Sequence, residues 1–105
     1  MEVGEIIQRF YSGDTIISYE EVIAVTSSGY ETEEVFGSIT YRKWWRDGKL
    51  HNLDGPAMIV IENGDTREYY YINGWNVNIH NFKEISKKLK ENKMLDWGIE
   101  GYRWK

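Results

Sequence analysis

The sequence is punctuated by dipeptides that favour tight β-hairpin turns. Asp47-Gly48, Asn63-Gly64 and Asn73-Gly74 lie close together in the chain, and each supplies two residues that tolerate the positive φ angles of a type I′ turn. The segments before and between these turns are rich in the β-branched and aromatic residues that favour strands. They span residues 39–46, 57–61 and 66–72. This spacing predicts an antiparallel β-meander.

The first 36 residues predict a short helix followed by strands. Apolar residues at positions 3, 6, 7 and 10 have the spacing of an amphipathic helix, and Gly13-Asp14 would end it. Residues 15–25 are rich in β-branched side chains, which predicts one strand, or two with a bend at Glu20-Glu21. The acidic segment 30–36 predicts an edge strand, because charges there discourage misplaced pairing.

The region after residue 80 predicts one amphipathic helix of about 12 residues, close to the usual helix length. Asn81 and Glu84 have the spacing of a capping box, and Phe82, Ile85 and Leu89 form an apolar stripe. Lysines cover the other faces, which is typical of a solvated surface. The final segment, 96–105, carries several large apolar residues and predicts a last strand or an ordered extension, because leaving them in water would be costly.

Length and composition indicate one small α+β domain, residues 1–105: an N-terminal part (1–36), a repeat-like meander (37–80), and a helix with its tail (81–105). The fold predicted is an antiparallel β-meander of about five or six strands with one C-terminal amphipathic helix. The chain has no cysteine, which excludes disulfides and thiol catalysis. It has neither a long apolar run nor a basic N-terminus, so a cytoplasmic location is expected. The net charge of −4 argues against a broad duplex-DNA footprint.

No residue pattern in the sequence indicates catalysis, so we expect no enzymatic activity, no cofactor and no metal. The two histidines, His51 and His80, lie in different turns without the spacing of a metal site. The pairs Glu20-Glu21 and Glu33-Glu34 cannot converge on one substrate atom, because neighbouring strand residues point to opposite faces. Ser27-Ser28 lacks the surroundings of an activated nucleophile.

An internal repeat lies within the meander. Residues 39–52 align with residues 65–78, so that Trp44-Trp45 matches Tyr70-Tyr71 and Asp47-Gly48 matches Asn73-Gly74. A repeat of this length suggests one supersecondary unit used more than once.

Residues 44–57 (WWRDGKLHNLDGPA) resemble a repeat of phage and giant-virus proteins that is similar to the MORN-type β-hairpin repeat. That repeat combines an aromatic pair, an Asp/Asn-Gly turn, a Lys-Leu-His segment and an Asp-Gly-Pro-Ala box. The resemblance covers roughly residues 39–85, and WNVNIH at 75–80 departs from it by replacing the second Lys-Leu-His segment. It implies a small phage or viral accessory protein that binds and inhibits a host protein, such as a component of a defence system of the CRISPR or restriction type.

The aromatic and basic residues of the repeat are the candidate partner-binding residues: Arg42, Trp44, Trp45, Arg46, Tyr70, Tyr71 and Trp75. Such residues are enriched at protein-interface hot spots, so a host protein is one expected partner. Rings beside cations can also bind single-stranded nucleic acid or a nucleotide, and they can serve only as internal cation–π pairs. The chain is expected to be a monomer or a homodimer, because edge strands of a meander can pair between copies.

Overall fold

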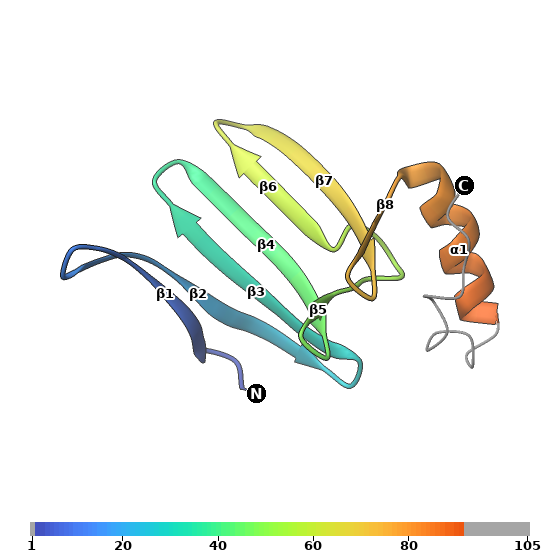
Figure 1. Ribbon diagram of the computed structural model, residues 1–105, viewed down its shortest axis with the longest axis horizontal. Coiled ribbons are helices and arrows are strands. Elements are labelled where there is room, and N and C mark those ends of the chain that lie inside the picture. The colour runs from blue at the N-terminus through green and yellow to red at the C-terminus, as the bar shows by residue number, and fades with distance from the viewer. Residues whose placement is uncertain (1, 92–105) are drawn as a thin grey trace.

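The computed structural model describes residues 2–91, which form one antiparallel sheet followed by one helix (Figure 1). The strands are β1 (Ile6–Ser12), β2 (Thr15–Thr26), β3 (Gly29–Phe36), β4 (Ile39–Arg46), β5 (Lys49–Leu50), β6 (Met58–Glu62), β7 (Asp65–Ile72) and β8 (Trp75–Val77), and the helix is α1 (Ile79–Glu91). The strand order is β1-β2-β3-β4-β6-β7-β8, with β5 paired to β4. The meander with one C-terminal helix is confirmed, but it has eight strands rather than five or six. The predicted tail, 96–105, lies outside the described residues.

The predicted N-terminal helix is wrong, because residues 6–12 form the edge strand β1. A register shift between Ile6 and Gln8 inserts an extra residue, Ile7, and so breaks the strict alternation that identifies a strand. The next segment is one continuous strand, β2, without a break at Glu20-Glu21.

The prediction that the acidic strand is an edge strand is wrong, because β3 lies between β2 and β4. Two of its carboxylates, those of Glu33 and Glu34, are accommodated because they meet hydrogen-bond donors on the neighbouring strands. Glu33 pairs with Arg42 of β4, with 3.0 Å between the guanidinium Nε and the carboxylate. Glu34 accepts a hydrogen bond of 3.1 Å from the Ser18 hydroxyl of β2. Acidic residues in a strand therefore did not indicate its place in this sheet.

The internal repeat has the same geometry in both copies. In the first, Trp45 lies opposite Leu50 and Arg46 opposite Lys49. In the second, the residues 26 positions later have the same register: Tyr71 lies opposite Asn76 and Ile72 opposite Trp75. The Asp47-Gly48 and Asn73-Gly74 turns both have positive φ at each residue, as a type I′ turn requires. Residues 39–50 and 65–77 are thus two copies of one hairpin.

The hydrophobic core lies at the C-terminal end of the sheet. The predicted stripe of α1, Phe82, Ile85 and Leu89, is buried against Ile72 and Val77. Among residues 2–91 the rest of the sheet is a single layer, and α1 lies beside β8 without covering β1–β4 (Figure 1). The radius of gyration is 15.3 Å, compared with about 12 to 13 Å for a compact domain of this length. Much apolar surface therefore remains in contact with solvent.

The helix begins earlier than the sequence predicts. The side-chain oxygen of Asn78 accepts a hydrogen bond of 3.0 Å from the Asn81 backbone N–H, so the N-cap is Asn78 and not Asn81. We expect Asn78→Ala to lower the free energy of unfolding by about 1 kcal/mol. Asn81→Ala is the matched control, since its side chain does not cap the helix, and should change stability by less than about 0.5 kcal/mol. Urea unfolding measures both values, and equal losses would contradict this assignment of the cap.

The register divides the strand residues between two faces, because residues paired across antiparallel strands share a face. The helix-side face carries Glu33, Arg42, Ile59 and Glu68, which are paired in that order, and it continues to Tyr70 and the core under α1. The opposite face carries Thr32, Lys43, Met58 and Tyr69, which are also paired in order.

Candidate binding surface

The seven predicted binding residues do not form one surface. Five belong to the helix-side face: Arg42, Trp44, Arg46, Tyr70 and Trp75. The other two, Trp45 and Tyr71, belong to the opposite face. Alternation along β4 and β7 separates the members of each aromatic pair, as a pleated strand requires.

On the opposite face, Trp45 belongs to a buried polar cluster. Its indole N–H donates a hydrogen bond of 2.9 Å to the Thr32 hydroxyl, and that hydroxyl donates one of 2.5 Å to the Glu20 carboxylate. The Trp45 ring stacks on Tyr30, with 6.3 Å between ring centroids. Lys43 lies over the Trp45 ring at 5.8 Å. These contacts give Trp45 a structural role.

On the helix-side face, the two arginines are already engaged. Arg42 pairs with Glu33, and Arg46 donates a hydrogen bond to the side-chain oxygen of Asn73. Tyr70 packs on Phe82 in the core, with 4.7 Å between ring centroids. Trp75 is 46% exposed. Of the predicted residues on this face, Trp44 and Arg46 line a cavity.

The cavity has a volume of about 420 Å³ and lies at the end of the helix-side face, which is within the usual size range of ligand pockets. Its floor comes from three neighbouring strands, where Ala24 of β2 lies opposite Glu31 of β3, and Glu31 lies opposite Trp44 of β4. The small Ala24 side chain leaves space beside the carboxylate.

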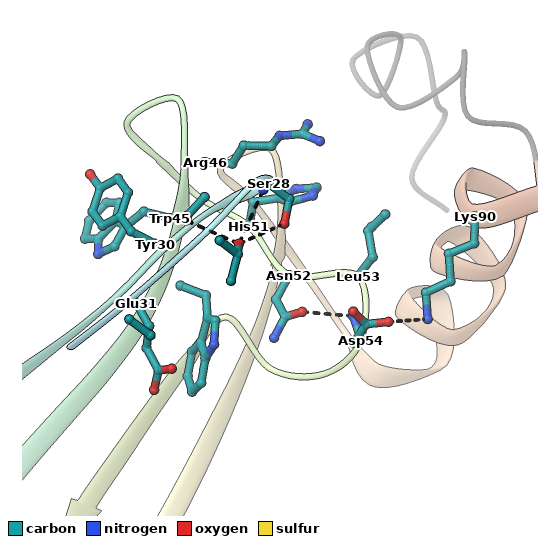
Figure 2. A pocket seen from close by; sticks show the side chains of 14 residues that line it. Ser28, Tyr30, Glu31, Trp45, Arg46, His51, Asn52, Leu53, Asp54 and Lys90 are labelled. Carbon is teal, nitrogen blue, oxygen red and sulfur yellow. Dashed lines mark hydrogen bonds and ion pairs between the residues drawn. The ribbon is translucent and has the colours of Figure 1, made fainter. Parts of the chain in front are cut away.

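The second wall of the cavity is the loop between β5 and β6. The Asn52 side chain holds this loop in shape, because it accepts a hydrogen bond of 2.9 Å from the Asp54 N–H and donates one of 3.0 Å to the Pro56 carbonyl. Asp54 reaches Lys90 of α1 at 2.8 Å, as Figure 2 shows. His51 also lines the cavity, and its Nδ1 accepts a hydrogen bond of 3.0 Å from the Asn73 N–H. Its neutral ring therefore carries the proton on Nε2.

Glu31 has neither a hydrogen bond nor an ion pair with its carboxylate among residues 2–91. Burial raises the pKa of this carboxyl above its ordinary value, the nearby Arg42 opposes the shift, and Glu33 adds to it. The net direction of the shift means that burial outweighs the stabilisation that Arg42 gives to the ionised carboxylate. Alternation along a strand puts Glu31 on the same face as Glu33, but it gives no sign of a cavity beside Glu31.

A second depression, of about 260 Å³, lies further along the same face. Ile17, Tyr19 and Val35 line it, together with the carboxylates of Glu21 and Glu33. The three apolar side chains are 43%, 49% and 51% exposed, so this part of the face is an open apolar patch with an acidic rim. None of the three was among the predicted binding residues. Their exposure depends on whether a helix or strand packs on this face, and the strand sequences alone do not indicate that.

Other kinds of site find no support in the described part of the chain. Residues 2–91 contain no group of three or more potential metal ligands. Within the same range, no helix is both long and apolar enough to cross a bilayer. No protein-family model, curated protein or solved structure matches this sequence.

Proposed function

We propose that this chain is a non-catalytic binding protein that docks a segment of another protein on the helix-side face of β2, β3 and β4. The observation that carries the proposal is the open patch of Ile17, Tyr19 and Val35 with its acidic rim. Contiguous exposed apolar patches with a polar rim often mark protein–protein interaction sites. The proposed site differs from the predicted one, since only Arg42, Trp44 and Arg46 of the predicted residues belong to it.

The charges of this face favour a basic and apolar partner. Three carboxylates share the face, those of Glu21, Glu31 and Glu33. Its cations are Arg42, which pairs with Glu33, Arg46, which donates to Asn73, and Arg9 of β1, which lies opposite Tyr19. The whole chain has a net charge of −4. Complementary charge steers association and selects the partner.

The same charges disfavour the alternative, a nucleic acid or nucleotide bound at the aromatic and basic face. Arg42 and Arg46 already have protein partners, and the Glu31 carboxylate next to Trp44 would repel phosphate. The narrower prediction, a phage or viral protein that inhibits a host defence component, rests on the resemblance of residues 44–57 alone and is proposed only on that basis.

Panning a random peptide library displayed on phage against the immobilised protein tests the proposal. We expect enrichment of peptides that combine large apolar residues with Lys or Arg. Val35→Asp should weaken binding of the selected peptides by at least about tenfold, because it places a charge in the apolar patch. Calorimetry or fluorescence anisotropy measures the change.

The matched control is Phe36→Asp. Phe36 is the next residue of β3 and is 44% exposed, but it belongs to the opposite face, where it pairs with Ile39. This variant should bind the selected peptides as the wild type does. Failure to enrich any peptide, or equal losses in the two variants, would reject the proposed surface.

A further inference from the structure

We propose that the cavity between Trp44, Glu31 and the loop 51–54 is a binding site for a guanidinium group, supplied by an arginine side chain of the docked protein segment. This inference rests on the proposed function for the source of the arginine, but the cavity itself can be tested without any partner. The residues that would bind the guanidinium line the cavity and are not part of the apolar patch.

The first argument is geometric. Directly opposed residues of antiparallel strands have Cβ atoms about 4.5 to 5.5 Å apart, so the Trp44 ring and the Glu31 carboxylate emerge side by side from the cavity floor. An aromatic face and a carboxylate in one recess offer a planar cation both stacking and charge-assisted hydrogen bonds.

The second argument concerns charge. The other carboxylate of the cavity, Asp54, is already neutralised by Lys90. Glu31 is a carboxylate without such a partner among residues 2–91. The Arg46 side chain also lines the cavity, but it extends away from Glu31 to the other side of the recess (Figure 2). Arg42 lies near enough to act on Glu31, but its Nε is engaged by Glu33 at 3.0 Å. A cation beside Glu31 would therefore meet a carboxylate that no side chain of residues 2–91 binds directly.

Arginine fits this site better than lysine. A guanidinium is planar, stacks on aromatic rings and pairs with a carboxylate through two parallel hydrogen bonds, whereas an ammonium is a compact and strongly hydrated point charge. From Glu31 to Val35 is four residues along β3, which corresponds to roughly 13 Å. A segment with an apolar residue in the patch and an arginine in the cavity would thus span the distance within a few extended residues.

The cavity is tested with N-acetyl-arginine methylamide as the probe, followed through the indole N–H signals of the tryptophans in two-dimensional NMR. We expect saturable shifts of the Trp44 indole signal. The neutral isostere N-acetyl-citrulline methylamide should bind at least about tenfold more weakly, because it lacks the charge that pairs with Glu31. Equal binding of the two probes would overturn the assignment.

Two variants locate the site. Glu31→Gln should weaken binding of the arginine probe at least about tenfold, while Glu68→Gln, on the same face but on β7, should leave it nearly unchanged. Because the folded-state pKa of Glu31 is raised, its ionisation costs stability above that pKa. Glu31→Gln should therefore melt at the same or a higher temperature at neutral pH, and loss of binding cannot be attributed to unfolding. Binding unaffected by Glu31→Gln would reject the site.

Comparing the affinity of the free arginine probe with that of the selected peptides shows whether the guanidinium comes from a docked segment. If the arginine is part of a docked segment, an arginine-containing peptide should bind more tightly than the free probe and lose that advantage when its arginine is replaced by citrulline. If the free probe, N-acetyl-arginine methylamide, binds more tightly than any peptide, the assignment to a partner residue is overturned. Probe binding without any selected peptide would retain the cavity and reject the proposed function.

Discussion

Gly29→Ala is expected to destabilise the protein by about 3 kcal/mol or more, at or beyond the upper end of ordinary overpacking. A Cβ atom on Gly29 would lie 1.9 Å from the backbone carbonyl oxygen of Trp45 and 3.1 Å from its carbonyl carbon. Both contacts are with backbone, so no side-chain rotation can relieve them. The start of β3 would have to separate from β4, and the cavity that Gly29 helps to line would open.

Urea unfolding monitored by far-UV circular dichroism measures this effect. Gly55→Ala is the control, because the nearest atom to its added Cβ is the Asn52 side-chain nitrogen at 3.9 Å, which is ordinary van der Waals contact. It should change stability by less than about 1 kcal/mol in either direction. A Gly29→Ala variant that unfolds at the wild-type urea concentration would show that β3 and β4 do not approach so closely in solution.

Thr32→Val should be the second severe substitution, with a loss of about 2 to 4 kcal/mol. Thr32 is fully buried, and its hydroxyl is both the donor to the Glu20 carboxylate and the acceptor for the Trp45 indole N–H. Valine has nearly the same shape but neither function, so it would leave Glu20, which is 2% exposed, and the indole N–H without this partner. The penalty comes from the unpaired groups rather than from altered packing.

Thr40→Val provides the comparison, since Thr40 is a strand residue on the helix-side face that pairs with Ile61. That variant should lie within about 0.5 kcal/mol of the wild type. A double-mutant cycle with Glu20→Met isolates the coupling. The double variant should lose less than the sum of the single losses, because both ends of one hydrogen bond are removed. Strict additivity would show that the Glu20 and Thr32 side chains do not interact.

Local signals in the sequence predicted those parts of the fold that local chemistry decides. The Asn-Gly and Asp-Gly dipeptides identified the hairpin turns, and the stripe of Phe82, Ile85 and Leu89 identified the helix. The N-terminal region was mispredicted because the bulge at Ile7 mimics helical spacing. The position of β3 was mispredicted because Arg42 and Ser18, which accommodate its carboxylates, come from strands on either side.

The candidate surface was only partly predictable for a related reason. Alternation along a strand puts Trp44 and Trp45 on opposite faces, but it cannot tell which of the two rings hydrogen-bonds to Thr32. The cavity joins Glu31, the loop at Asn52 and Lys90, which are far apart in sequence. The patch around Val35 is open because no helix or strand within residues 2–91 covers β2–β4, and no residue of the patch itself predicts this.

The single-layer sheet has a further consequence for how the chain resists unfolding. The main contacts of each strand are with its immediate neighbours in the sheet, as in solenoid proteins, whose stability is a sum of unit and nearest-neighbour terms. The coupling between the unfolding of two strands then weakens as the number of strands between them increases. α1 buttresses the β7–β8 end, whereas β1 has a neighbour on one side only. A ligand bound across β2, β3 and β4 would connect the β1 end of the sheet more firmly to the end that α1 stabilises. Binding should therefore make the unfolding of the sheet more cooperative.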